Sequence, residues 1–448
     1  MSFPKYPGYR DSGVPWVPVV PAHWRTGGLR WLAKRFSGGT PDKNTQEYWH
    51  DGTIPWLNSG AVNQALITEP STFISESGFA YSSAKWIPAG ALVMALAGQG
   101  KTKGMAAQLA ISSTCNQSMA AIVPAAEMQP RFLLWWLQSN YQNIRNMAGG
   151  DMRDGLNLDL LGEIPCPIPR LDEQTAISTF LDRETSKIDA LVKEQKRLIE
   201  LLKEKRQAVI SQAVTKGLDP DVPMKDSGVE WLGEVPAHWD VWRVKDAARL
   251  ESGHTPSKQV PEYWEDCDIP WVSLNDSKQL AVVDYISETA VCINELGLAN
   301  SSARMLPTGA VVFTRDATIG LAAITSRPMA VSQHLIAWCP GERINALYLL
   351  RVFNVMKDFL DAATFGATIK TIGMADVKNL VTPLPQVSEQ REIAAFIGVR
   401  KSEFDALISE AESATALLGE RRAALISAAV TGKIDVRSLI PQPEAATA

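Results

Sequence analysis

The stretch LDEQTAISTFLDRETSKIDALVKEQKRLIELLKEKRQAVISQAVTKG, residues 171–217, decides the fold of this chain. It holds no proline and no glycine before its last residue, and good helix formers dominate it, so it predicts one long helix. Apolar residues recur at alternating spacings of three and four, which is the period of a coiled coil. Glu184, Gln195 and Lys205 interrupt this seam. The helix therefore needs a partner that covers the seam.

A second copy of the pattern begins 216 residues later and fills residues 387–432. Where the first copy has Gln195 and Leu198, the second has Ala411 and Ala414. Large residues opposite small ones favour a close intramolecular helix pair. The alternative is two unrelated amphipathic helices, each lying on its own domain. The residues predicted to form the seam are Ile177, Leu181, Ile188, Leu191, Leu198, Leu202, Ile393, Ile397, Phe404, Leu407, Leu418 and Leu425.

Size and composition set the broad class of the protein. A chain of 448 residues predicts two to four domains, and its 46% hydrophobic content predicts folded cores rather than disorder. The five cysteines show no CxxC spacing, which favours a reducing compartment without disulfides or zinc. The N-terminus lacks the apolar core of a signal peptide, and the longest uncharged run, residues 104–126, is rich in polar residues. We therefore expect a cytoplasmic protein with no membrane span, metal or cofactor.

The charge balance limits the ways in which this chain could bind nucleic acid. Its net charge is −5, residues 1–165 are slightly basic and residues 226–382 are acidic. A generic basic surface is therefore not expected. If DNA is the ligand, local clusters must make the contacts, and binding should be weak without partners.

The whole chain consists of two copies of one internal sequence repeat. His23-Trp24 returns as His238-Trp239, and Thr40-Pro41 returns as Thr255-Pro256. Glu47-Tyr48-Trp49 and Ile54-Pro55-Trp56 also return, as Glu262-Tyr263-Trp264 and Ile269-Pro270-Trp271. Between these anchors the side chains diverge almost completely. The sequence therefore predicts a shared scaffold with different loops.

Each copy is predicted to contain a β-rich domain, a proline-rich elbow and a long helix, which makes the fold α+β. Short apolar runs predict strands at Ala91–Leu96, Met105–Ile111, Met119–Val123, Ala310–Thr314, Leu321–Thr325 and Leu335–Trp338. A helix is predicted late in each domain, at Pro130–Met147 and Asn345–Ala363. The predicted boundaries are 1–165 and 236–382 for the domains, 166–217 and 383–435 for the helical regions, 218–235 for a linker and 436–448 for a disordered tail.

Catalytic patterns in the sequence are weak. Residues 95–102, ALAGQGKT, resemble a relaxed phosphate-binding loop, and this leaves a nucleotide hydrolase at Lys101 as an alternative. However, the residues that follow predict a strand, whereas a phosphate-binding loop is followed by a helix. His23 and His238 have no matching nucleophile or carboxylate nearby, so structural roles are expected for them. No methyltransferase signature occurs, and we expect a chain without catalytic activity of its own.

Polar and basic residues on the divergent loops are the candidate DNA contacts. Arg, Lys, Asn and Gln read guanine and adenine edges, while Ser and Thr bind phosphates. Any one of these residues alone is no more than an ordinary solvated side chain, but together they flank the glycine turns. In the first domain they are Ser37, Thr40, Lys43, Lys101, Thr102, Lys103, Asn116, Gln117 and Arg153; in the second they are Thr255, Lys258, Arg315, Thr318, Gln333, His334 and Lys370.

Over residues 10–435 the arrangement resembles the specificity subunit of type I restriction–modification systems. The resemblance is carried by DSGVEWLGEVPAHW at 226–239, Ser-Gly-x-Thr-Pro, Ile-Pro-Trp, and Pro-x-Pro followed by Glu-Gln and an Asp-Ala-Leu helix, each present twice in related form. The family implies two target-recognition domains joined by two long antiparallel coiled-coil helices with pseudo-twofold symmetry. The acidic second domain departs from this pattern and leaves its DNA-binding face open.

The resemblance also implies partners and a division of labour. Each domain would read one half of a bipartite double-stranded DNA target, and two DNA adenine methyltransferase subunits would bind the chain. Restriction and translocation subunits would join them. Because a helix rises about 1.5 Å per residue and can hold two readers more than one turn of DNA apart, we also expect helix length to set the unread spacer. The chain itself would be non-catalytic. The alternative from another class is a coiled-coil scaffold without DNA preference; the DNA target itself cannot be read from the sequence.

Overall fold

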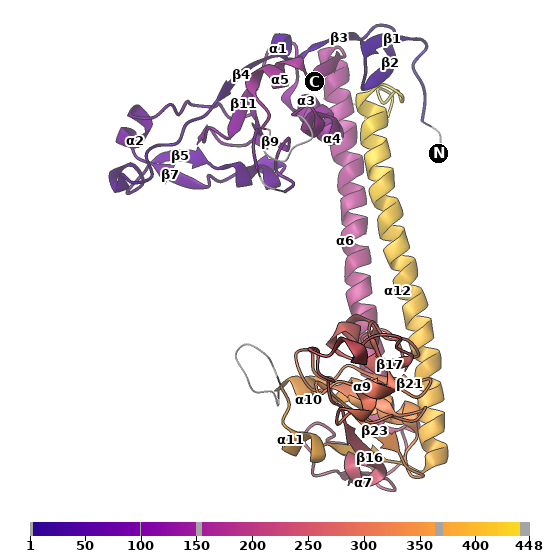
Figure 1. Cartoon of the computed structure of the whole chain (residues 1–448). Helices are drawn as coiled ribbons and strands as arrows, with labels where there is room; N and C mark the ends of the chain where they lie inside the picture. Colours follow the sequence, from indigo (N-terminus) through magenta and orange to yellow (C-terminus); the bar gives the residue numbers. More distant parts are fainter. Residues whose placement is uncertain (1–2, 99, 149–154, 363–370, 440–448) are drawn as a thin grey trace. The chain divides into compact units, whose positions relative to one another are not determined.

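The computed structural model describes residues 3–98, 100–148, 155–362 and 371–439 (Figure 1). The chain forms two compact units. Unit 1 consists of Met1–Gln195 and Ser413–Ala448, and unit 2 consists of Lys196–Glu412. Each unit therefore contains one globular domain together with a part of each long helix.

The domain of unit 1 is built on a five-stranded sheet and a smaller three-stranded sheet. The large sheet has the order β4-β11-β8-β9-β6, antiparallel except for the parallel pair β6 and β9. The small sheet has the order β10-β5-β7. The strand bounds are β4 Ala33–Ser37, β5 Ile54–Leu57, β6 Leu66–Ile67, β7 Thr72–Ile74, β8 Leu92–Ala95, β9 Ala106–Leu109, β10 Thr114–Cys115 and β11 Met119–Pro124.

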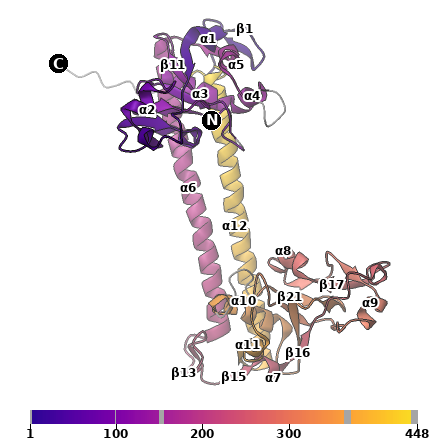
Figure 2. The same ribbon diagram turned by 60° about the vertical axis from the view of Figure 1, so that its left-hand side comes forward.

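The domain of unit 2, whose strands β16, β17 and β21 are labelled in Figure 2, repeats this topology. Its large sheet has the order β16-β23-β20-β21-β18 and its small sheet the order β19-β17-β22, so each strand has a counterpart in unit 1. The strand bounds are β16 Ala248–Ser252, β17 Ile269–Val272, β18 Tyr285–Ile286, β19 Cys292–Ile293, β20 Val311–Thr314, β21 Ala322–Thr325, β22 Ala330–Val331 and β23 Leu335–Pro340. The six predicted strands are confirmed, and the two domains are duplicates.

Short helices and two-stranded sheets complete both units. The helices are α1 Leu29–Leu32, α2 Glu76–Ala80, α3 Pro130–Ser139, α4 Tyr141–Asn146, α5 Leu158–Glu163, α7 Val244–Ala247, α8 Ser277–Leu280, α9 Glu295–Ala299, α10 Ala346–Ala362 and α11 Met374–Lys378, with 3-10 turns at Gln46–Tyr48, Ser59–Asn63, Pro261–Tyr263 and Leu274–Asp276. The paired strands are β1 Tyr9–Val14 with β2 Val17–Pro21, β3 Arg25–Gly28 with β12 Pro165–Ile168, β13 Met224–Asp226 with β14 Glu234–Pro236, and β15 Asp240–Arg243 with β24 Val381–Leu384.

Two long helices dominate the α-helical content, as predicted. Helix α6 covers Leu171–Lys216 and α12 covers Val387–Val430. Gly217 and Gly432 follow them with φ angles of 75° and 71°, and glycine adopts this left-handed conformation without steric cost. The glycines therefore fix where both helices end.

The long helices lie antiparallel within each unit. In unit 1 the beginning of α6, at Ile177 and Leu181, shares a core with the end of α12, at Ala429 and Val430. In unit 2 the end of α6, at Ile210, Ala213 and Val214, shares a core with the beginning of α12, at Ile393 and Ile397. The chain numbering rises along one helix while it falls along its neighbour, so the two helices run in opposite directions in both units.

The buried seam differs from the predicted one by a single position along its middle. Ile177, Leu181 and Ile188 are buried, but Leu191 and Leu198 are 52% and 43% exposed. Their neighbours Val192 and Ile199 face the core instead. On α12, Leu407 is 48% exposed and Ile408 is buried. An α-helix has 3.6 residues per turn, so a straight helix drifts from a 3.5-residue repeat and moves the buried stripe to the next residue.

Four of the remaining seam positions lie inside the units. Leu425 is buried, Leu202 and Leu418 pack against neighbouring clusters, and Phe404 is half-buried. The single-residue drift therefore affects Leu191 and Leu198 on α6 and Leu407 on α12.

The repeated Glu-Gln pair explains how each domain is attached to the helix that follows it. The side chain of Gln174 accepts a hydrogen bond from the backbone N–H of Gln129 at 2.8 Å. It donates to the carbonyl oxygens of Glu127 and Pro169, at 3.0 and 2.9 Å. Gln390 makes the matching contacts with Asn345, Arg343 and Pro385 in unit 2. Both glutamines are fully buried, so each acts as a clamp between the domain and its helix.

Four predicted segments differ from the structure. The predicted helix Pro130–Met147 breaks at Asn140, which ends α3 and begins α4. The proline-rich elbow Pro165–Ile168 is the strand β12, and the predicted linker contains β13. Val436 is fully buried in the core of unit 1, so ordered packing extends past the predicted start of the tail. The rest of the predicted tail, 440–448, lies outside the described residues.

Candidate nucleic-acid interface

In unit 1 the loop that follows β4 rests directly on the turn between β10 and β11. The backbone N–H of Gly39 donates to the carbonyl oxygen of Cys115 at 2.8 Å. A Cβ atom on Gly38 would lie 1.9 Å from that same oxygen, so only glycine fits here. This close approach places Thr40 beside Gln117, and the hydroxyl of Thr40 donates a hydrogen bond to the side-chain oxygen of Gln117.

Two tryptophans support the same loop through hydrogen bonds to its backbone. The indole N–H of Trp56 donates to the carbonyl oxygen of Gly39 at 2.9 Å, and that of Trp49 donates to the carbonyl oxygen of Asp42 at 3.0 Å. The two rings meet edge to face, with centroids 5.2 Å apart. Both ends of the loop are therefore tied to an aromatic pair, and the loop presents Thr40 and Lys43 from a fixed base.

These residues surround a shallow pocket of about 480 Å³. Its lining consists of Thr40, Lys43, Trp49, Trp56, Asn58, Asn116, Gln117 and Ser118. Lys43 carries the one charge among these residues, so the wall attracts anions. The side-chain oxygen of Asn116 is buried and has no hydrogen-bond partner among the residues that the structure describes. A buried acceptor left unpaired costs about 1–3 kcal/mol.

Unit 2 contains the same arrangement of a threonine–glutamine hydrogen bond beside a pair of tryptophans, which we call the frame. The hydroxyl of Thr255 donates to the side-chain oxygen of Gln333. The indole N–H groups of Trp264 and Trp271 donate to the carbonyl oxygens of Ser257 and His254, both at 3.1 Å. The ring centroids lie 5.4 Å apart, again edge to face. Ser332 takes the place of Asn116, and within the described part of unit 2 its buried hydroxyl also lacks a partner.

A connected row of polar side chains extends from this frame in unit 2. His334 Nε2 lies 3.3 Å from the amide nitrogen of Gln333, and His334 Nδ1 lies 2.7 Å from a carboxylate oxygen of Asp316. Arg315 follows, with its Nε 3.9 Å from Asp316. Thr255, Gln333, His334 and Arg315, all predicted from sequence, are thus brought together. Asp316 joins them and was not predicted.

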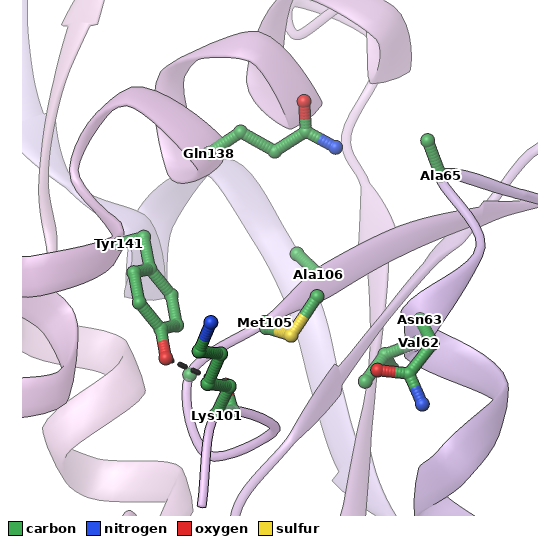
Figure 3. Close-up of a pocket in the computed structure, with 9 residues that line it drawn as sticks. Val62, Asn63, Ala65, Lys101, Met105, Ala106, Gln138 and Tyr141 are labelled. Carbon is green, nitrogen blue, oxygen red and sulfur yellow. Dashed lines mark hydrogen bonds between the residues drawn. The ribbon is translucent and has the colours of Figure 1, made fainter. Parts of the chain in front are cut away.

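Lys101 belongs to a different site. It lies in the hairpin loop between β8 and β9, and its carbonyl oxygen accepts a hydrogen bond from the hydroxyl of Tyr141 at 2.5 Å. It lines a pocket of about 380 Å³ with Gln138, Tyr141 and mostly apolar neighbours (Figure 3). Strand β9 follows this loop, as the sequence predicted, whereas a phosphate-binding loop is followed by a helix, and this disfavours the nucleotide hydrolase alternative.

Three other basic positions change the predicted list. Lys103 is only 5% exposed and interacts within the protein, and its contact with DNA stays a prediction. Arg153 and Lys370 lie outside the described residues. Among the polar positions, Thr318 is exposed, whereas Ser37 and Thr102 are half-buried, with Ser37 at the end of β4.

The sequence analysis found no matching carboxylate for His23 and His238, but the structure brings one to each of them. His23 Nε2 lies 3.0 Å from the buried carboxylate of Glu173, and His238 Nε2 lies 3.1 Å from Glu389. Both glutamates stand in the first turn of a long helix. The two histidines therefore attach the start of each domain to that helix.

Sequence reasoning missed Trp49, Trp56, Asn58, Ser118 and Asp316. The tryptophans are repeated as Trp264 and Trp271, and that repetition was a signal: a repeated aromatic beside a divergent loop indicates a support for that loop. Asp316 had no signal of its own, because its role depends on the contact with His334, 18 residues away. No cluster of three metal-ligating side chains occurs in the described ranges, and no described helix is long and apolar enough to cross a bilayer.

A family model for the type I restriction modification DNA specificity domain matches residues 21–201 and 236–410. These two segments cover most of the chain and contain both copies of the site. The chain therefore belongs to the type I restriction–modification DNA specificity family.

Individual relatives agree with this assignment. The specificity subunit of type I restriction enzyme MjaIX from Methanocaldococcus jannaschii is 30% identical over 189 residues, which is 42% of each chain. The EcoR124I/EcoR124II specificity subunit of Escherichia coli is 27% identical over 201 residues, 44% of this chain and 49% of that one. The chain thus spans less than half the length of these two relatives. The MjaVIII specificity subunit is 23% identical over 70% of this chain and 72% of its own.

Two solved structures share the fold. A chain from a study titled "Structural basis underlying complex assembly and conformational transition of the type I R-M system" matches with a TM-score of 0.72, covering 92% of this chain and 99% of that one at 16% identity. The HsdS subunit from Thermoanaerobacter tengcongensis matches with a TM-score of 0.57, also at 16% identity, over 92% and 98% of the two chains.

Proposed function

We propose that this chain is the DNA specificity subunit of a type I restriction–modification complex and that each of its two domains reads one half of a bipartite duplex target. The observation that carries the proposal is the duplicated frame. Thr40 with Gln117, and Thr255 with Gln333, stand on matching tryptophan pairs. Different neighbours surround the two copies. Two readers with one support and different faces suit two different half-targets.

The chemistry of the divergent faces suits base recognition. Asn116 carries the amide that pairs with adenine edges, and Arg315 carries the guanidinium that pairs with guanine. Asp316 offers a carboxylate that can accept from the amino group of cytosine. The exposed amines of Lys43 and Lys258 supply contacts to phosphates.

The long helices would hold the two readers and bind the partner subunits. At about 1.5 Å per residue, a helix of this length extends on the order of 65 Å, about two turns of DNA. Apolar side chains on both helices are left exposed, at Leu191, Leu198, Leu201, Leu407 and Leu417. Such residues are what a docked protein subunit covers. We propose that two DNA adenine methyltransferase subunits bind there and that the restriction and translocation subunits join through them.

In this proposal the chain is non-catalytic and acts in the cytoplasm. The methyltransferase subunits would supply S-adenosylmethionine and the pocket for the flipped adenine. The specificity subunit would choose the site and position the duplex.

The test is to determine the DNA methylation pattern of the native host with the chain, without it, and with a chimera. The chimera replaces residues 37–165 with those of another member of the family. Deletion of the chain is expected to remove one bipartite methylated motif, and the chimera is expected to change one half of it while keeping the other half and the spacer. An unchanged pattern after deletion would leave the scaffold without DNA preference as the better reading.

A second experiment tests whether the length of the long helices sets the length of the unread spacer. Removing one heptad from each long helix, at matching positions, should alter the spacer and leave both half-sites as they are. A change in the half-sites with the same spacer would refute that role.

A further inference from the structure

The two copies of the site allow a comparison within a single molecule. Threonine, lysine, glutamine and both tryptophans are the same in both units, as Thr40, Lys43 and Gln117 and their counterparts Thr255, Lys258 and Gln333 show. The neighbours of the glutamine differ. We infer that the identical set holds the sugar–phosphate backbone and makes no sequence choice, whereas the differing set selects bases. This inference rests on the proposed function and assigns roles within the same site.

The identical set cannot distinguish two different half-targets. The threonine–glutamine hydrogen bond and the tryptophan pair recur in each unit, although the amide nitrogen of Gln333 also lies 3.3 Å from His334. A recurring set of donors favours the part of DNA that does not vary. That part is the backbone, which receives half or more of the hydrogen bonds in protein–DNA complexes. If the two half-targets differ, their difference has to be read elsewhere.

The hydrogen bond between threonine and glutamine leaves this set with hydrogen-bond donors facing outward, as a phosphate-binding site requires. Because the hydroxyl of Thr40 donates to the side-chain oxygen of Gln117, the amide N–H groups of this exposed glutamine are left to donate outward. Lys43 on the same pocket wall adds three further donors and a positive charge. Phosphate oxygens accept from both groups, and the glycine and tryptophan contacts of the loop keep those donors in place.

The differing set begins one residue to either side of the glutamine. Unit 1 has Asn116 and Ser118 there, and unit 2 has Ser332 and His334. In unit 2 the histidine continues into Asp316 at 2.7 Å. Asp316 keeps one buried oxygen that has no hydrogen-bond partner within the described residues. These side chains offer different donors and acceptors on equivalent turns, as readers of different bases require.

The experiment compares two kinds of variant in the complete complex. Lys43→Ala removes a proposed contact with the sugar–phosphate backbone of DNA. Lys258→Ala is the equivalent variant in unit 2. The double variant Asn116→Ser with Ser118→His places the turn residues of unit 2 in unit 1. The methylated motif is read from the host genome. Binding of the purified complex to its target duplex and to an unrelated duplex of equal length is measured at several salt concentrations.

Lys43→Ala is expected to keep the motif unchanged, to weaken binding to both duplexes about equally, and to lower the slope of log affinity against log salt by about one. The transplanted turn is expected to change one half of the motif, with a matching change in the ratio of target to unrelated binding. Lys43 and Lys258 are exposed, so the lysine variants are expected to fold.

Two results would overturn the assignment: a Lys43→Ala complex that alters the letters of the motif, or a transplanted turn that is folded, methylates DNA and reads the original motif. Failure of the proposed function looks different, because then the wild-type chain itself produces no motif and its complex binds both duplexes equally.

Discussion

The turn that carries Gln117 in unit 1 continues into Ser118, which ends in a hydroxyl, while the turn that carries Gln333 in unit 2 continues into His334, which is bonded to Asp316. The same contrast appears elsewhere in the two domains. The backbone of Ala65 in unit 1 and that of Asp284 in unit 2 accept equivalent hydrogen bonds from the neighbouring strand. Ala65 lines an open pocket, whereas Asp284 makes two hydrogen bonds to Arg351, at 2.7 and 2.6 Å.

This comparison separates what the fold requires from what each domain can vary. The sheet order, the glutamine clamps and the tryptophan pairs are the same in both units. The side chains between them range from alanine to a buried ion pair. A frame fixed by backbone contacts and clamps therefore tolerates large changes of charge in its loops.

The largest effect is expected when unit 2 is given the residue of unit 1. In Asp284→Ala the guanidinium of Arg351, only 2% exposed, loses its charged partner. Leaving one partner of a buried ion pair alone costs about 3 kcal/mol. Urea unfolding at pH 7 should show this loss, and Ala65→Ser in unit 1 is the matched control, with a change within about 0.5 kcal/mol.

The same variant tests the pH dependence of this ion pair. Burial alone would raise the pKa of Asp284, but the hydrogen bonds and charge of Arg351 outweigh burial and lower it. A carboxylate with a lowered pKa stabilises the folded state above its unfolded pKa, about 3.9, and loses that contribution as the pH falls through the folded pKa. The difference between wild type and Asp284→Ala should therefore persist at pH 7 and shrink below about pH 4. A difference that stays constant at low pH would contradict the assignment.

A smaller loss is expected from the frame that both units share. In Gly38→Ala the new Cβ would lie 1.9 Å from the carbonyl oxygen of Cys115, and in Gly253→Ala it would lie 2.2 Å from that of Ser332. Overpacking of this kind costs about 2 kcal/mol, and both units should lose similar amounts in urea unfolding. Gly398→Ala in α12 is the control: its new Cβ would have no atom within 4 Å apart from the neighbouring backbone of its own helix, and alanine should stabilise the helix by up to about 1 kcal/mol. Unequal losses at the two glycines would show that the frames are not equivalent.

The sequence predicted the periodic parts of this molecule well. The long helices, six strands and the duplication follow from spacing, propensity and terminal glycines. The seam was displaced by one residue at Leu191, Leu198 and Leu407 because a straight helix with 3.6 residues per turn drifts from a 3.5-residue repeat. On α6, Glu184 and Gln195 also interrupt the apolar pattern. Where the apolar pattern is interrupted, two neighbouring stripes fit it nearly equally, and the twist of the helix pair decides between them.

The site was only partly predictable. Thr40 and Gln117 were both named from their chemistry, but their hydrogen bond joins positions 77 residues apart, and only the strand order brings them together. The burial of Lys103 could not be predicted, because a lysine in a glycine-rich loop is usually solvated, yet here it is buried. Local chemistry identifies candidates, while tertiary contacts decide which of them share a surface.

The smallest expected effect concerns two ion pairs at equivalent positions of the long helices. Asp189 bonds to Arg422 at 2.9 Å in unit 1, and Asp405 bonds to Arg206 in unit 2. The side chains of the first pair are 55% and 36% exposed, those of the second 40% and 31%. In unit 2, Lys401 also contacts Asp405 at 3.2 Å. Less solvent screening should make the second pair the stronger one.

Double-mutant cycles with alanine at both positions of each pair measure this difference. Coupling free energies of about 0.5 kcal/mol are expected, with the larger value in unit 2, and both should fall in 1 M salt because exposed charges are screened there. The contact with Lys401 remains when Arg206 is removed, so the cycle isolates the bond between Arg206 and Asp405. Equal couplings in the two units would mean that the difference in exposure is too small to matter. Coupling that resists salt would mean instead that the helix pair excludes water around these charges more fully than their exposed fractions indicate.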